Sequence, residues 1–391
     1  MDITNLDDII AIDGKLSDEE RLVRDTTRRF VREEFLPTIQ AHFENATFPK
    51  AIIPQLGELG LLGANIQGYG CAGMNNTAYG LAMHELEYGD SGLRSFVSVQ
   101  GALCMYPIHR FGSEEQRERW LPEMAKGAVV GCFGLTEPAA GSDPGAMTTR
   151  AHRDGNEWVI SGQKMWITNS SVSDLCIVWA KTDGDEAKGI RGFLVERDRK
   201  GLSCPETHHK MSLRASVTGE IVLDEVRVPD SNLLPGTSGL GSALACLNQA
   251  RFGIASGTVG AARACFDEAL AYAQERIVFG KPIAAKQLIQ KQFTDSATQI
   301  ALGQLLMLHL CRIKDEGKLT PFQVSMAKRN NCEMALNVAR SCRAILGGNG
   351  ISAEFATIRH MLNLESVYTY EGTHEVHTLI VGRGLTGQDA F

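Results

Sequence analysis

The spacing of apolar residues divides the chain into a helical region, a β-rich region and a second helical region. Up to about residue 129 apolar positions recur at helical spacing. Residues 17–20 and 113–116 each have the sequence of a capping box, so we expect a helix to begin at each. The first helix is expected to bury one face and to end at a proline, with Leu22, Thr26, Phe30, Val31 and Phe35 followed by Pro37.

Between about residues 130 and 237 the pattern changes to short runs rich in β-branched residues. The runs 157–169, 175–182, 192–198 and 219–229 are separated by Gly, Asp and Asn turns. Long helical segments return at 242–275, 285–316 and 321–346. Since helices and strands do not alternate as βαβ units, we predict an α+β fold with an N-terminal helical domain (1–129), a middle antiparallel β domain (130–237) and a C-terminal helical bundle domain (238–391).

A glycine motif offers an alternative to this fold class. Residues 68–73 match G-x-G-x-x-G and precede a helical stretch, as a dinucleotide-binding fingerprint requires. The preceding residues 55–62 are typical of a helix end rather than of a strand, and no βαβ unit surrounds them. We therefore favour a simple loop over a nicotinamide-binding turn.

Composition and charge narrow the possible partners. Lys and Arg total 39 against 46 for Asp and Glu, so a net charge of -7 offers no basic field for nucleic acid or anionic lipid. The acidic start, residues 1–8, lacks the features of a secretory signal or transit peptide, and no apolar run reaches membrane-spanning length. We expect a cytoplasmic protein that binds neither nucleic acid nor membrane. The 10 cysteines are scattered without C-x-x-C pairs, which favours buried thiols over zinc or redox sites.

Glu371 lies between a bulky aromatic residue and a glycine, just before a predicted last helix. Two interpretations of this stretch remain open. It is an ordinary helix start, with Thr373 as N-cap and Glu375 in the first turn. Alternatively, apolar surroundings raise the pKa of Glu371 and make it a usable base. His374 and His377 are three residues apart rather than the four of zinc proteases, so we expect no metal there.

Four stretches together point to a known family. They are 133–138 with 141–143; 166–169; Arg276 with 279–280 and Gln287; and 346–350 with 370–373. In this order the chain resembles the acyl-CoA dehydrogenases over essentially its full length. Within that family the likeness is to the members that act on glutaryl-CoA, on the strength of Glu87, Arg94, Ser95, "SLRAS" at 212–216 and "NLESVYTYEGTH" at 363–374.

The resemblance implies a homotetramer that binds FAD without a covalent link. Residues implied to lie along the flavin and its ribityl chain are Phe133, Leu135, Thr136, Gly141, Ser142, Trp166, Ile167 and Thr168. A neighbouring subunit is implied to reach the pyrophosphate and adenine through Arg276, Phe279 and Gln287. Gly347 and Gly348 are implied to let backbone come close to the same cofactor, and Leu346, Thr373 and Glu375 to contact it as well. By their own sequence, "WITN" at 166–169 equally suits an amphipathic strand, and Arg276 a solvated helix residue.

The resemblance also implies the chemistry. Glu371 would take the α-proton of an acyl-CoA thioester while the flavin accepts hydride from the next carbon, and Tyr370 and Gly372 would line the substrate. Members of the family that carry their base on an earlier helix place it where this chain has Ala250, which favours Glu371. The implied CoA contacts are Ser142, Leu247, Asn248 and Arg251.

Substrate choice would depend on Arg94. A surface arginine is the alternative from local sequence, but the resemblance puts Arg94 and Ser95 at the distal carboxylate of a five-carbon diacid thioester. Glu87 beside Arg94 resembles the decarboxylating members, which form crotonyl-CoA and carbon dioxide and pass electrons to electron-transferring flavoprotein. A non-decarboxylating glutaryl-CoA dehydrogenase, another short-chain acyl-CoA dehydrogenase and a non-catalytic scaffold are the competing interpretations.

Overall fold

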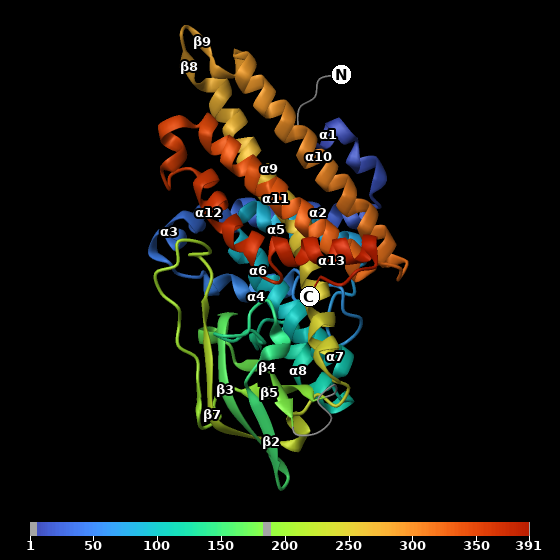
Figure 1. Cartoon of the computed structure of the whole chain (residues 1–391). Coiled ribbons are helices and arrows are strands. Elements are labelled where there is room, and N and C mark those ends of the chain that lie inside the picture. The colour runs from blue at the N-terminus through green and yellow to red at the C-terminus, as the bar shows by residue number, and fades with distance from the viewer. Residues whose placement is uncertain (1–5, 183–188, 391) are drawn as a thin grey trace.

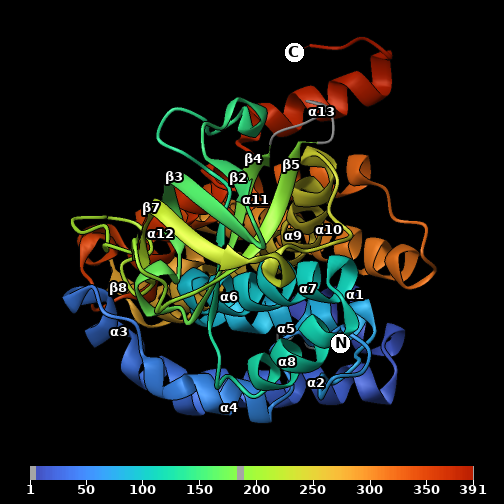
Figure 2. The ribbon, with the colours of Figure 1, turned by 90° about the horizontal axis from the view of Figure 1, so that it is seen from below.

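Helices at both ends of the chain flank a β-sheet built from its middle. The computed structural model describes residues 6–182 and 189–390, so most of the acidic stretch 1–8 lies outside the described residues. In Figure 1 the long helices occupy the upper part of the molecule and the sheet the lower part. The N-terminal helices α2, α3 and α4 lie along one side and α13 along the opposite side (Figure 2).

The N-terminal region is helical, as the apolar spacing predicts. Both predicted capping boxes are present, at Ser17 with Glu20 and at Ser113 with Gln116. The helices are α1 (Leu6–Ile10), α2 (Asp18–Phe30), α3 (Leu36–Asn45), α4 (Ile53–Glu58), α5 (Asn76–Gly89), α6 (Ser91–Ser98), α7 (Tyr106–Phe111) and α8 (Glu114–Ala125).

The expected helix end at Pro37 is wrong. Residues Val31–Phe35 form a π-helical turn that joins α2 to α3, and Pro37 lies in the first turn of α3. A proline is tolerated there because its missing N–H falls where the hydrogen-bond ladder changes register. Leu22 was also placed on the wrong face, since it is exposed while Thr27 is buried.

The middle region forms one sheet with the strand order β1-β4-β2-β3-β7-β6, and β5 pairs with β4. The predicted antiparallel pairing is present in four of the six strand pairs that the structure describes here, β2 with β3, β3 with β7, β4 with β5 and β6 with β7. It does not hold for β1 and β2, which both pair with β4 in parallel. Six of the eight residues of β4 are buried, as is usual for a strand among parallel neighbours. The strands are β1 (Gly131–Gly134), β2 (Arg150–Asp154), β3 (Glu157–Thr168), β4 (Leu175–Thr182), β5 (Ile190–Glu196), β6 (Leu202–Ser203) and β7 (Thr218–Pro229).

The C-terminal region consists of long helices whose bounds agree with the predicted segments within a few residues. A short hairpin, β8 (Ile277–Val278) and β9 (Lys281–Pro282), projects between the first two. The G-x-G-x-x-G motif at 68–73 is a loop between α4 and α5, as predicted. The helices are α9 (Leu240–Glu275), α10 (Gln287–Asp315), α11 (Pro321–Ile345), α12 (Ala356–Thr369) and α13 (His374–Thr386).

Two helices that carry the candidate site, α5 and α9, approach very closely. A Cβ added at Gly260 of α9 would lie 1.9 Å from the carbonyl oxygen of His84 on α5. A Cβ added at Gly257 would lie 2.1 Å from the Glu87 carboxylate. Glycine at these positions therefore sets the distance between the two helices.

We predict that Gly260→Ala lowers the thermal unfolding midpoint by several degrees, because the added methyl pushes α9 away from α5. Gly241→Ala is the matched control on the same helix, since a Cβ there meets nothing within 4 Å. The control is expected to leave the midpoint unchanged or slightly higher. Differential scanning calorimetry of the three proteins makes the comparison, and equal midpoints for both variants would contradict this packing argument.

Candidate active site

The turn that carries Glu371 joins α12 to α13. Thr373 is the N-cap of α13, and its hydroxyl accepts a hydrogen bond from the N–H of Val376 at 3.2 Å. Glu371 itself has a φ of 54°, a region that residues other than glycine seldom occupy. The helix-start interpretation is therefore correct for Thr373, and it leaves Glu371 in an unusual backbone conformation just before the cap.

The Oε2 atom of the Glu371 carboxyl group is buried, while the residue as a whole is half-buried. Among the described residues its Oε2 atom has no hydrogen-bond partner. Burial raises the pKa of Glu371 above its ordinary value, and the charges of Arg94, Arg251 and Lys328 only partly oppose this rise. A carboxylate in such surroundings is a stronger proton acceptor than one in water, which is what a general base requires.

Arg94 is buried beside this turn, not at the surface. Its side chain is 1% exposed, and its Nε donates to Oε2 of Glu87 at 2.7 Å. Its Nη2 donates to the phenol oxygen of Tyr370, whose oxygen also lies 3.3 Å from Ser95 Oγ. Burial alone would lower the pKa of Arg94, but Glu87 and Tyr370 outweigh it and raise the pKa, so the guanidinium stays charged.

Three helices thus assemble the pair. Glu87 comes from α5 and Arg94 from α6, while Gly257 of α9 leaves the room that the carboxylate needs. The other Glu87 oxygen accepts from Ser91 Oγ at 2.9 Å. A buried charge persists only when it is paired and hydrogen-bonded, and both members of this pair meet that condition.

Residues of α9 reach the Glu371 turn from another side. Arg251 Nε donates to the backbone carbonyl of Glu371 at 2.7 Å, and its Nη1 lies 3.4 Å from Asn248 Oδ1. Leu247 is largely buried in the cluster that connects α9 with the sheet. Arg251 therefore contacts the base-bearing turn itself, in addition to the CoA contact predicted for it.

The first group of predicted cofactor residues lies on β1, on the loop after it and at the end of β3. Thr136 connects these segments, since its carbonyl accepts from the N–H of Met165 at 2.9 Å. A register irregularity in β3 coincides with a φ of 61° at Trp166, a residue that is 57% exposed. Gly141 and Ser142 are exposed as well, and an exposed aromatic residue suits contact with a flat ring system. Phe133, Leu135 and Ile167 are buried beneath, and Thr168 is half-buried.

The second group lies at the opposite end of the molecule, around the β8–β9 hairpin in Figure 1. Arg276, Phe279 and Gln287 are exposed, Phe279 at 93%. Gly347 and Gly348 are exposed as well, with nothing within 4 Å of an added Cβ. Leu346 is buried, so only its backbone is available. Lys328 of α11 contacts the Glu371 turn, and the stretch of α11 from Lys328 to its end at Ile345 is about 26 Å long at about 1.5 Å per residue. This length of helix separates the turn at Gly347 from the Glu371 region.

The two groups are therefore not brought together within one chain. Thr373 and Glu375 stay with the Glu371 turn at the start of α13. A dinucleotide that used both groups would have to bridge two subunits.

Sequence reasoning missed two buried lysines. Lys328 of α11 donates to the carbonyl oxygens of Tyr370 and Gly372 at 2.9 and 2.8 Å. Lys164 of β3 pairs with Glu137 at 2.9 Å, in the same loop as Thr136. Glu137 had a possible signal, an acid inside a recognised stretch, but Lys328 had none, because one lysine within a helix matches no chemical motif.

His374 stacks on Tyr368 with ring centroids 4.6 Å apart, and His377 is buried. Within residues 6–182 and 189–390 there is no cluster of three or more His, Cys, Asp or Glu side chains arranged to hold a metal ion. Across those same ranges no helix is long and apolar enough to cross a bilayer.

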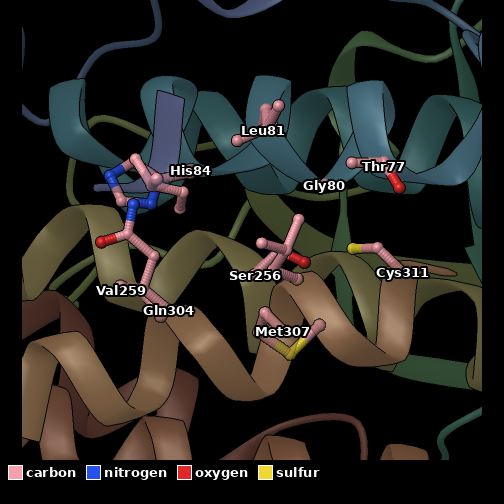
Figure 3. Close-up of a pocket in the computed structure, with 11 residues that line it drawn as sticks. Thr77, Gly80, Leu81, His84, Ser256, Val259, Gln304, Met307 and Cys311 are labelled. Carbon is pink, nitrogen blue, oxygen red and sulfur yellow. The ribbon is translucent and has the colours of Figure 1, made fainter. Parts of the chain in front are cut away.

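A separate small cavity lies between α5, α9 and α10 (Figure 3). Gly80 faces Ser256 and Cys311 across it, and His84 lies near Gln304 at one end. Its volume of about 30 Å³ is space for a water molecule rather than for an acyl chain. It takes no part in the site described above.

Comparison with known proteins agrees with this geometry. Models of the acyl-CoA dehydrogenase N-terminal, middle and C-terminal domains match residues 17–128, 132–226 and 237–386. The mitochondrial short-chain specific acyl-CoA dehydrogenase of Bos taurus is 36% identical over 375 residues, which cover 95% of this chain and 91% of that protein.

Two similar solved structures are glutaryl-CoA dehydrogenases from Mycobacterium smegmatis. One is 54% identical with a TM-score of 0.97 and covers 99% of both chains. The other, in complex with FADH2, is 51% identical with a TM-score of 0.96 and covers 98% of both chains.

The chain belongs to the acyl-CoA dehydrogenase family, with helical N- and C-terminal domains around a middle β domain. It is a flavin-dependent oxidoreductase that dehydrogenates acyl-CoA thioesters.

Proposed function

We propose that the chain is a glutaryl-CoA dehydrogenase that also decarboxylates its product. The observation that carries this proposal is the buried Glu87–Arg94 pair beside Tyr370 and Glu371. A guanidinium has more N–H donors than its two bonds to Glu87 and Tyr370 use, so it can also bind a carboxylate. A buried cation next to the base suits an acyl chain that ends in an anion and disfavours one that ends in a methyl group. The similarity to glutaryl-CoA dehydrogenases at 51–54% identity supports the same substrate.

In this proposal Glu371 removes the proton from the carbon next to the thioester carbonyl. Its raised pKa makes the carboxylate basic enough to share that weakly acidic proton. Arg94 and Ser95 hold the distal carboxylate and so set the position of the acyl chain over Glu371. The backbone N–H of Glu371 is aimed at the thioester oxygen, where negative charge develops.

FAD is the cofactor, held without a covalent link, and when bound it accepts the hydride. The exposed residue Trp166 and the exposed segment at Gly141 and Ser142 fit one part of it. Exposed Arg276 and the open Gly347–Gly348 backbone suit phosphate oxygens. Electrons leave to an electron-transferring flavoprotein.

Decarboxylation follows from the position of Glu87. Its carboxylate already neutralises Arg94, so loss of the substrate carboxylate as carbon dioxide leaves no unpaired buried cation. Protonated Glu371 returns its proton to the γ-carbon and completes crotonyl-CoA. Without the Glu87 carboxylate, release of carbon dioxide would leave Arg94 buried and unpaired.

Glu371→Gln is expected to bind glutaryl-CoA while the flavin stays oxidised, because an amide cannot take the α-proton. Anaerobic stopped-flow mixing measures flavin absorbance. Glu365→Gln on α12 is the control, since Glu365 is exposed and forms a surface ion pair with Arg340. It should reduce the flavin like the unmodified enzyme. Rapid bleaching in Glu371→Gln would mean that another group is the base.

The substrate and the products distinguish the proposal from its relatives. Turnover of glutaryl-CoA should far exceed that of butyryl-CoA, because only the diacid offers a carboxylate to the N–H donors that Arg94 does not use on Glu87 and Tyr370. With an electron-transferring flavoprotein as acceptor, carbon dioxide should appear in equal amount with crotonyl-CoA, as measured by gas analysis and chromatography. Accumulating glutaconyl-CoA would reject decarboxylation, and equal turnover of butyryl-CoA would indicate another short-chain acyl-CoA dehydrogenase.

A homotetramer is the assembly we propose, because the two groups of cofactor residues lie far apart in one chain. The distal end also exposes apolar side chains that a neighbour would cover: Ile277, Phe279, Leu288 and Ile351. Light scattering of the FAD-loaded protein should give four times the mass of one chain. A monomer that retains its FAD would contradict a cofactor site shared between subunits.

A further inference from the structure

Lys328 is buried in the middle of α11, with 1% of its surface exposed. Its ammonium group donates to the carbonyl oxygen of Gly372 at 2.8 Å and to that of Tyr370 at 2.9 Å. A third carbonyl, that of Tyr368 near the end of α12, lies at 3.5 Å. The lysine therefore uses its donors on the backbone at both sides of Glu371 and leaves none for a surface partner.

Arg251 completes this arrangement from α9. Its Nε donates to the carbonyl of Glu371 at 2.7 Å, between the two carbonyls that Lys328 holds. Three successive carbonyls, at residues 370, 371 and 372, thus all accept hydrogen bonds from two buried cations. Charge-assisted bonds of this kind are stronger than those between neutral groups, and leaving a buried carbonyl without a partner is costly.

The backbone that these cations hold is one that would not persist unsupported. The last carbonyls of a helix have no partners within that helix, and α12 ends at Thr369. Glu371, two positions after Thr369, has a φ of 54°. A left-handed conformation at a residue with a side chain persists only when its surroundings enforce it. If Glu371 returned to a negative φ, its carboxyl group would swing away from its present direction.

We propose that Lys328 is a positioning residue that fixes the Tyr370–Gly372 backbone so that the Glu371 carboxyl group meets the substrate carbon. This role rests on the proposed function of Glu371 as the base. Lys328 acts through the turn and touches neither the acyl chain nor the cofactor in this account.

Lys328 also contributes charge to the site. Together with Arg94 and Arg251 it opposes the rise that burial causes in the pKa of Glu371. His377, which lies against Gly372, adds no charge near neutral pH, because burial lowers its pKa to about 3. The titratable groups that face Glu371 from α5, α6, α9, α11, α13 and its own turn are Tyr79, Arg94, Arg251, Lys328, Cys332, His377 and Tyr370.

Removing Lys328 therefore has two expected effects on the holoenzyme. The rate of flavin reduction by glutaryl-CoA at neutral pH falls by about 100-fold, because the base is no longer held within about 1 Å of its working position. The acidic limb of the pH–rate profile moves to higher pH, because one of the cations that lowers the pKa of Glu371 is gone. Substrate affinity changes little, so kcat falls while KM does not rise in proportion.

The experiment measures the rate of flavin reduction in Lys328→Met, Lys328→Arg and Lys314→Met by anaerobic stopped flow, from about pH 5 to about pH 9 in steps of roughly one pH unit. Lys328→Arg keeps the charge and the donors, so it should retain the acidic limb of the unmodified enzyme and recover much of the rate. Lys314→Met is the matched control, since Lys314 has a buried Nζ that packs 3.9 Å from the centre of the Phe252 ring and has no hydrogen-bond partner among the described residues. It should leave both the rate and the limb unchanged.

A folded, FAD-loaded Lys328→Met that reduces its flavin at the unmodified rate with an unshifted limb would overturn the proposal. If Lys328→Met yields no holoenzyme, Lys328→Gln replaces it. The amide of the glutamine can donate to a carbonyl but carries no charge, so the acidic limb of the pH–rate profile should still move to higher pH. An unmoved acidic limb together with an undiminished rate in Lys328→Gln would also overturn the proposal. Rapid flavin reduction by Glu371→Gln would instead overturn the role of Glu371, whereas an inactive Glu371→Gln beside a fully active Lys328→Met overturns only that of Lys328.

Discussion

The site depends on the Glu371 carboxyl group, whose Oε2 atom is buried without a hydrogen-bond partner among the described residues and which is nevertheless held in a fixed direction. Burial without a partner raises the pKa of Glu371 and makes it a base. The same burial would normally be avoided, because an unpaired buried charge is costly. The protein manages this cost by placing cations from α6, α9 and α11 around the group, close enough to favour the charged form in part and not bonded to its Oε2 atom.

The packing of the helices brings these cations together around Glu371. Glu87 and Arg94 are seven positions apart across the break between α5 and α6, and Gly257 allows α9 to approach them. Arg251 and Lys328 come from two further helices and both bind the backbone of the Glu371 turn. Since the N- and C-terminal helical regions each supply part of the set, the base would not be positioned by either region alone.

Much of the fold could be predicted from sequence because its signals are local. The capping boxes and the bounds of α9, β4 and α11 follow from periodicity and from residues next to each other in the chain. The parallel pairing of β4 with β1 and β2 could not be predicted in this way, because pairing depends on strands that are distant in sequence. Pro37 does not end the helix as expected, because the π-helical turn Val31–Phe35 lets the chain continue into α3.

The candidate site likewise has features that local sequence predicts and features that it does not. Glu371, Arg94 and Glu87 could be singled out because they stand in recognisable stretches, and the structure places Arg94 against Glu87 and against Tyr370, the neighbour of Glu371. The role of Lys328 and the positive φ of Glu371 could not be predicted, because both depend on contacts between segments that are distant in sequence. The central claim is tested most directly by a crystal structure of the FAD-loaded enzyme with bound glutaryl-CoA. We expect the Glu371 carboxyl group to lie against the carbon next to the thioester and Arg94 against the distal carboxylate. A ligand whose distal carboxylate lies in solvent, with Glu371 turned away from the acyl chain, would contradict the account.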